Sequence, residues 1–244
     1  MMVKLEQLLI FFIAVLPSAT SQNPITCDQS CPGGQFPTVP YPFGFNSACT
    51  IQLNCTSNGD VLIGDFSVQQ ITSSYLLVSL PAKCGRSIDT LMHLYSEHYA
   101  PLSTNGIVLD NCTEQQMRTC MISMTKLRTD PKIANCSGDQ AGEGRVSCYS
   151  SDTSTTSMFL DYKNVTRTGC RFLFSGVAFS LDVQRVRLGW WLSGTCNCSV
   201  DADCIKIVYP VDGSNGHRCE SRSEGDGHKT SSGSPSLKGM RNLL

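Results

Sequence analysis

Short apolar, β-rich runs in the first half of the chain are interrupted by polar breaks, a pattern typical of strands. Three such runs lie at 50–56 (TIQLNCT), 60–71 (DVLIGDFSVQQI) and 74–80 (SYLLVSL), separated by SNGD and by Thr and Ser. The Asn-Gly pair favours a tight turn, and Pro81 ends the third run. These runs predict a hairpin or meander, and a further strand is predicted at 105–112 (NGIVLDNC).

Residues 87–99 (SIDTLMHLYSEHY) follow a different period and predict a helix with Ser87 as its N-cap. Its apolar face comprises Ile88, Leu91, Leu94 and Tyr95. A second short helix is predicted at 114–127. Three later strands are predicted, joined by loops rich in Ser, Thr and Gly: 145–150, 158–162 and 178–192.

The N-terminus has the features of a secretory signal. Lys4 precedes an apolar run at 8–16, and small residues follow it. The run is about half of the ~20 residues that a bilayer requires, so it predicts a cleaved signal peptide over 1–21. The later apolar stretch 172–183 is also short and contains Gly176 and Asp182. We therefore expect a secreted chain without a membrane-spanning segment.

All 14 cysteines lie beyond this predicted signal peptide. An even number in a secreted chain predicts a disulfide framework, whose pairing the sequence leaves open. No Cys-x-x-Cys occurs, and Cys196-x-Cys198 is the closest approach to a metal motif, so no metal is expected. The candidates are Cys27, Cys31, Cys49, Cys55, Cys84, Cys112, Cys120, Cys136, Cys148, Cys170, Cys196, Cys198, Cys204 and Cys219.

Five Asn-x-Ser/Thr sequons suit the same compartment and predict N-glycosylation. Four have a cysteine in the middle position, where disulfide formation competes with glycosylation. The sequons begin at Asn54, Asn111, Asn135, Asn164 and Asn197.

Charge and motifs narrow the possible functions. The formal net charge is −1 and basic runs are absent, which argues against nucleic-acid binding. Residues 22–110 hold two basic side chains, Lys83 and Arg86, against six acidic ones. Hydrolase, metalloprotease and phosphate-loop motifs are missing, and His93 and His98 would lie on different faces of a helix. We therefore expect a binding protein without catalysis or a cofactor.

Aromatic side chains are candidate contacts for sugar rings. The stretch 39–45 (VPYPFGF) lies within the first cysteine cluster, and its prolines and Gly44 predict an extended corner with a turn. Tyr41 and Phe43 belong to it. In GWWL, strand alternation predicts one tryptophan inward and the next, Trp191, outward. A structural role for these rings is the alternative.

A family resemblance rests on residues 27–55. They contain a Cys-x3-Cys pair, the Tyr-Pro-Phe-Gly element and two cysteines around Leu53. This arrangement resembles the galacturonan-binding domain at the head of plant wall-associated receptor kinases. Segments 99–112 and 188–204 resemble the subgroup of wall-associated receptor kinase-like proteins.

Two departures from the family pattern stand out. Pro32 intervenes before Gly33, and Ser221 occupies the place of a cysteine in the EGF-like ending that DGSNGHRC otherwise resembles. Full-length members of the family are single-pass plasma membrane proteins that continue into a transmembrane helix and a kinase. We expect this chain to lack both of these parts.

The strand pattern and the resemblance together imply a mainly β, disulfide-rich fold: two small β-rich modules, one or two short helices and a degenerate EGF-like ending. The expected divisions are a signal peptide at 1–21, a galacturonan-binding-like domain at 22–111, a second cysteine-rich domain at 112–195, the degenerate EGF-like segment at 196–227 and a disordered tail at 228–244.

The resemblance implies non-catalytic binding of pectin or galacturonan in the cell wall or apoplast, in wall sensing or defence. Candidate ligand contacts are Lys83, Arg86, Tyr41, Phe43 and Trp191. The alternative is a protein-interaction module that acts as a soluble decoy or co-receptor for membrane-bound receptor kinases.

Overall fold

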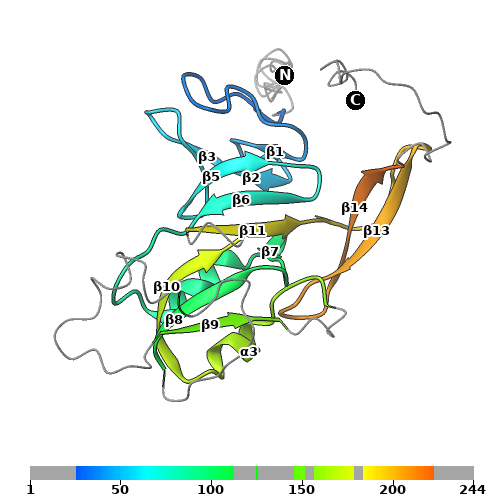
Figure 1. Ribbon diagram of the computed structural model, residues 1–244. Helices are drawn as coiled ribbons and strands as arrows, with labels where there is room; N and C mark the ends of the chain where they lie inside the picture. Colours follow the sequence, from blue (N-terminus) through cyan, green and yellow to red (C-terminus); the bar gives the residue numbers. More distant parts are fainter. Residues whose placement is uncertain (1–25, 113–124, 126–145, 152–156, 179–183, 223–244) are drawn as a thin grey trace, which may run out of the picture.

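The computed structural model describes residues 26–112, 125, 146–151, 157–178 and 184–222 (Figure 1). The described chain is mainly β, as predicted, with short helical segments at η1 (Ile88–Leu94) and α3 (Tyr162–Thr166). Its strands are β1 (Phe43–Gly44), β2 (Ile51–Gln52), β3 (Asn54–Cys55), β4 (Val61–Ile63), β5 (Phe66–Ile71), β6 (Tyr75–Ser79), β7 (Tyr99–Pro101), β8 (Gly106–Cys112), β9 (Ser147–Ser150), β10 (Cys170–Val177), β11 (Arg185–Trp190), β12 (Leu192–Ser193), β13 (Ala202–Val208) and β14 (Asn215–Ser221).

The largest sheet has six strands in the order β3-β4-β5-β6-β11-β7. The predicted meander forms β3 to β6, where successive antiparallel strands are neighbours. β11 comes from more than a hundred residues later and lies between β6 and β7, antiparallel to both. Buried apolar side chains on β4, β5 and β6 supply much of its core face.

A second, three-stranded sheet has the order β10-β8-β9 and lies below the first in Figure 1. β8 lies in its centre, paired on both edges, and buries four consecutive residues, Gly106 to Leu109, as a strand covered on both faces does. The predicted boundary between residues 111 and 112 falls inside β8. Each of these two sheets therefore contains strands from both sides of that boundary.

Two local predictions need correction. The helix predicted at 87–99 is a 3-10 helix that ends at Leu94, although Ser87 is its N-cap as expected and accepts from the Asp89 backbone N–H. The strand predicted at 158–162 is absent. Phe159 makes an isolated bridge with Leu102, and the chain then enters α3, capped by Asp161. The predicted helix at 114–127 lies outside the described residues except for residue 125.

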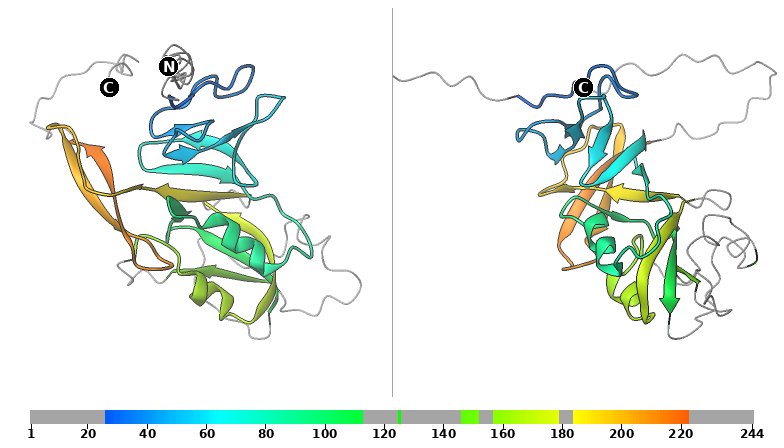
Figure 2. Two further views of the ribbon diagram at one scale, coloured as in Figure 1. Left: turned by 180° about the vertical axis from the view of Figure 1, so that it is seen from behind. Right: turned by 90° about the vertical axis from the view of Figure 1, so that its left-hand side faces the viewer.

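The C-terminal strands form a third unit, a sheet in the order β12-β14-β13. The view from behind in Figure 2 shows the long β13–β14 ribbon along one side of the other sheets. The sequence predicted only loops and disulfide bridges here, because residues 196–222 have few apolar side chains. Two paired strands are present nevertheless, and seven residues of β13 face seven of β14 in unbroken register.

Candidate functional site

The segment that contains Lys83 and Arg86 follows β6 and is held against β10. The Lys83 N–H donates to the Phe174 carbonyl (3.1 Å), and the Leu173 N–H donates to the Arg86 carbonyl (2.9 Å). Ser87 continues this pairing in a bridge with Phe172. Cys84, between the two basic residues, is disulfide-bonded. The backbone that carries both cations is therefore fixed from two sides.

Arg86 lies half-buried without a carboxylate partner among the described residues. One terminal nitrogen, Nη2, donates to the Pro81 carbonyl (2.6 Å), whereas Nη1 is buried and finds no hydrogen-bond acceptor in the described part of the chain. Burial lowers the pKa of Arg86 from its ordinary value. A guanidinium in this state would be stabilised by an anionic acceptor.

Lys83 is exposed and has no ion pair within the described ranges. Arg171 on β10 is also exposed and directly precedes Phe172, the partner of Ser87. The predicted second cysteine-rich domain therefore contributes a basic residue whose backbone lies next to the Lys83–Arg86 segment. The sequence alone did not indicate which strand would lie alongside this segment. On the acidic side, the Asp89 carboxylate accepts a hydrogen bond from the Ser87 hydroxyl (3.0 Å).

The three aromatic candidates for ligand contact differ in how much of each side chain is exposed. Tyr41 is 71% exposed and offers a ring face to solvent. Phe43 and Trp191 are 1% and 2% exposed, and neither presents a face at the surface. The expectation that one tryptophan of GWWL points outward is wrong, because Trp190 is buried as well. β11 ends at Trp190, and Trp191 is covered by Tyr209 of the C-terminal ribbon, at 5.4 Å between ring centroids.

The VPYPFGF stretch is a structural corner. Phe43 packs edge-on against Trp190, with 5.4 Å between ring centroids, and Phe45 packs against the core. A structural role therefore fits these two rings, whereas the exposed Tyr41 ring is not packed into the core. Gly44 is required for a different reason from the predicted turn. A Cβ at this position would overlap the sulfurs of Cys49 and Cys27, which form a disulfide against the backbone of Gly44.

The cysteine framework is confirmed for the described residues. Cys219, whose expected family neighbour is replaced by Ser221, is bonded to Cys198, and Cys84 and Cys148 are also disulfide-bonded. None of the described cysteines is free. The pairs given by the structure are Cys27–Cys49, Cys31–Cys55, Cys112–Cys170, Cys196–Cys204 and Cys198–Cys219.

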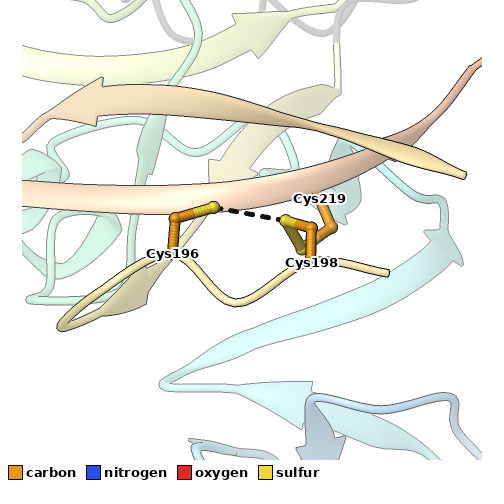
Figure 3. Close-up of side chains that lie close together, drawn as sticks. All are labelled: Cys196, Cys198 and Cys219. Carbon is orange, nitrogen blue, oxygen red and sulfur yellow. Dashed lines mark hydrogen bonds between the residues drawn. A yellow bond between two sulfur atoms is a disulfide. The ribbon is translucent and has the colours of Figure 1, made fainter. Parts of the chain in front are cut away.

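Sulfur atoms gather most closely in the C-terminal ribbon, where those of Cys196, Cys198 and Cys219 lie within 4.8 Å of one another (Figure 3). Three sulfurs at this spacing have the composition of a thiolate metal site. Each of them is committed to a disulfide, however, and a metal requires the thiolate. The oxidised cluster therefore provides no thiolate ligands.

The predicted sequons differ in their surroundings. Asn54, Asn164 and Asn197 are exposed, whereas Asn111 is partly buried with φ of 54°. Asn135 lies outside the described residues, as do the predicted signal peptide and tail. Glycosylation stays a prediction at all five positions.

Arg218 is a residue whose importance sequence reasoning missed. It is 4% exposed and donates through Nη1 to the carbonyls of Ser74 (3.1 Å) and Trp190 (3.0 Å). It also pairs with Glu220 (2.6 Å) and lies 5.7 Å from the centre of the Trp190 ring. An arginine in a cysteine-rich loop is normally solvated, and no local signal in GHRC indicated burial.

Comparison with known proteins identifies relatives along most of the chain. Wall-associated receptor kinase-like 14 of Arabidopsis thaliana is 34% identical over 236 residues, which cover 88% of this chain and 32% of that protein. Wall-associated receptor kinase-like 21 of the same plant is 32% identical over 224 residues, covering 87% and 34%. No family model and no solved structure matches.

The chain thus spans about a third of the length of these relatives. Neither helical segment in the described part has the length and apolar character needed to span a bilayer. The alignment extends over both predicted cysteine-rich modules and confirms the resemblance seen in the cysteine pattern. This chain is homologous to a region of the wall-associated receptor kinase-like proteins.

Proposed function

We propose that this chain is an extracellular, non-catalytic receptor-type module that binds acidic polysaccharide of the plant cell wall, of the pectin or galacturonan class. The observation that carries the proposal is the alignment, over nearly nine tenths of the chain, with two proteins named for wall association. The disulfide framework suits an extracellular location.

The state of Arg86 supports an acidic ligand. Its Nη1 is buried and lacks an acceptor among the described residues, which is costly for a charged group, so a shift of this half-buried side chain toward an external carboxylate would be favourable. A uronate carboxylate has the planar geometry that a guanidinium binds through two hydrogen bonds. The Lys83–Arg86 segment is held by β10, so little backbone entropy would be lost on binding.

The remaining charges fit a small, local contact. The first 110 residues are acidic overall, so a broad electrostatic surface for a polyanion is not expected there. Lys83, Arg86 and Arg171 lie on adjoining stretches of backbone where the segment after β6 meets β10. The site proposed here therefore recognises one or a few carboxylates.

Binding of oligogalacturonides to the folded chain tests this function. We expect an affinity that falls steeply between low and physiological salt, and that is lost when the carboxylates are fully methyl-esterified, because both changes weaken charge–charge contacts. Binding of the esterified and free oligomers with equal affinity would contradict the proposal.

A protein-interaction module is the second candidate, and β13 favours it. This seven-residue strand pairs only with β14 within the described sheet, so its outer edge is open. Val200 and Val208, which lie near its two ends, are 86% and 58% exposed. An open edge of this kind is a template for strand addition by a partner protein. Salt-insensitive capture of a receptor ectodomain, without oligogalacturonide binding, would favour this candidate.

A further inference from the structure

Two disulfides lie next to each other in the C-terminal ribbon. Cys196 is bonded to Cys204 on β13, and Cys198 is bonded to Cys219 on β14. The Cys196 and Cys198 sulfurs are only 3.3 Å apart although they are not bonded to each other (Figure 3). Cys204 and Cys219 in turn are directly opposite in the antiparallel register. The sulfurs of Cys196, Cys198 and Cys219, which belong to two different disulfides, thus lie within 4.8 Å of one another.

Accessibility distinguishes this four-cysteine cluster (Cys196, Cys198, Cys204 and Cys219) from the other three disulfides whose pairing the structure gives. In the cluster, three cysteines are exposed and Cys198 is half-buried. Each of the other three pairs contains a buried member, namely Cys49, Cys31 or Cys170, with exposures of 9%, 0% and 6%, and of their partners only Cys55 is exposed. Attack by an external thiolate requires access to a sulfur.

We propose that the four-cysteine cluster is a thiol–disulfide exchange site, and that its substrates are external thiols and dithiols. A dithiol's first thiolate bonds to the Cys204 sulfur and breaks the bond to Cys196, whose thiolate takes a proton from water. The second thiol then displaces Cys204 and closes the reagent's own disulfide. Two electrons and two protons pass from the dithiol to the protein.

The freed Cys196 thiolate can react further within the cluster. At 3.3 Å from Cys198 it attacks that sulfur, forms a Cys196–Cys198 bond and releases Cys219 as the thiolate. This step moves a disulfide without any net oxidation or reduction. It leaves Cys204 and Cys219 as thiols on neighbouring strands, where cross-strand side chains are close.

Exchange has a structural consequence. In the observed pairing, both bridges fasten the 196–198 loop to the β13–β14 ribbon. After exchange the loop is cross-linked only to itself and is released from the ribbon. The cluster would thus act as a redox-controlled latch next to the open edge of β13, independent of any polysaccharide ligand.

Graded reduction of the native protein tests accessibility. The folded chain is treated with increasing dithiothreitol, labelled with N-ethylmaleimide and mapped after digestion. We expect the four cluster cysteines to be labelled at lower reductant concentrations than Cys31, Cys49 and Cys170 and their partners. Equal or earlier labelling of those three pairs, or no cluster labelling until the protein unfolds, would overturn the proposal.

The variant Cys219→Ser tests exchange itself. It leaves Cys198 without its partner, next to the Cys196–Cys204 bond. We expect the single thiol to be found at both Cys198 and Cys204, because Cys198 displaces Cys204 from Cys196. Cleavage before Asp201 and Asp203 and after Lys206 separates the two labelled positions. Label confined to Cys198 would overturn the exchange step, and Cys49→Ser, in which we expect label only at Cys27, is the matched control.

Discussion

At the scale of single residues, buried polar side chains determine how the loops join the sheets. Asn105 is fully buried, and its amide donates to the carbonyls of Leu102 and Arg187 (2.8 Å each). Its side-chain oxygen also accepts from the Arg187 backbone N–H (2.9 Å). The side chain thus completes the pairing of β11 where β7 ends. The sequence predicted a strand from residue 105 and gave no indication of this role for the Asn105 side chain.

Replacing Asn105 with alanine should destabilise the protein by about 1–3 kcal/mol, because the Arg187 N–H loses its side-chain acceptor in a buried place, whereas the Leu102 and Arg187 carbonyls each keep a backbone donor. Thr104→Ala is the control, since the Thr104 side chain is exposed and its interaction with Arg187 uses the backbone carbonyl. Denaturant unfolding of the oxidised proteins measures both. A loss below about 0.5 kcal/mol for Asn105→Ala would show that water or neighbouring groups replace these bonds.

At the scale of elements, the C-terminal ribbon is attached to the six-stranded sheet through Arg218 and the two tryptophans. Arg218 reaches the turn before β6 and the end of β11. Gly216 lets the ribbon approach closely, because a Cβ there would overlap the Trp191 ring. The ending that is degenerate by family standards is therefore an integral part of the fold.

The variant Arg218→Ala should destabilise the docked ribbon by about 1–3 kcal/mol, since it removes a buried donor from the Ser74 and Trp190 carbonyls, whereas Glu220 stays solvated at 41% side-chain exposure. Arg222→Ala is the matched control. Its ion pair with Asp203 (2.7 Å) is exposed, so we expect a loss below about 1 kcal/mol. Hydrogen exchange of β13 and β14 reports the effect, and equal protection in the two variants would contradict this role for Arg218.

Sequence patterns predicted the strands of the first meander, where β4, β5 and β6 pair with their neighbours in sequence. β8 and β9 also fell within predicted runs, although their partners are distant in sequence. β10 was missed over its whole length because its buried, nearly continuous apolar run lacks alternation. The place of β11 depends on contacts distant in sequence, and so do the burial of Trp191 and the proximity of Arg171 to Ser87.

At the scale of the whole molecule, each of the two main sheets contains strands from both predicted cysteine-rich modules, which were divided at residue 111. The first module alone would lack β11 between β6 and β7, and β8 would lose both partners, β9 and β10. These absent strands cover apolar faces that a fragment could not bury.

We therefore expect a secreted fragment of residues 22–111 to lack a cooperative unfolding transition, whereas a chain of residues 22–222 unfolds cooperatively. Thermal unfolding followed by circular dichroism compares the two. A cooperative transition of the short fragment would show that the first module folds independently.

Recognition of wall polysaccharide is the central claim, and oligogalacturonide binding to wild type and to the double variant Lys83→Ala/Arg86→Ala tests it most directly. The control is Lys163→Ala/Arg167→Ala, which removes two exposed charges at α3. We expect the first pair of changes to weaken binding by about 1–3 kcal/mol, roughly 5–150-fold, and the control to have little effect. Unchanged affinity in the folded Lys83/Arg86 variant would remove these residues from the site, and absence of binding by the wild-type chain would contradict the proposed function itself.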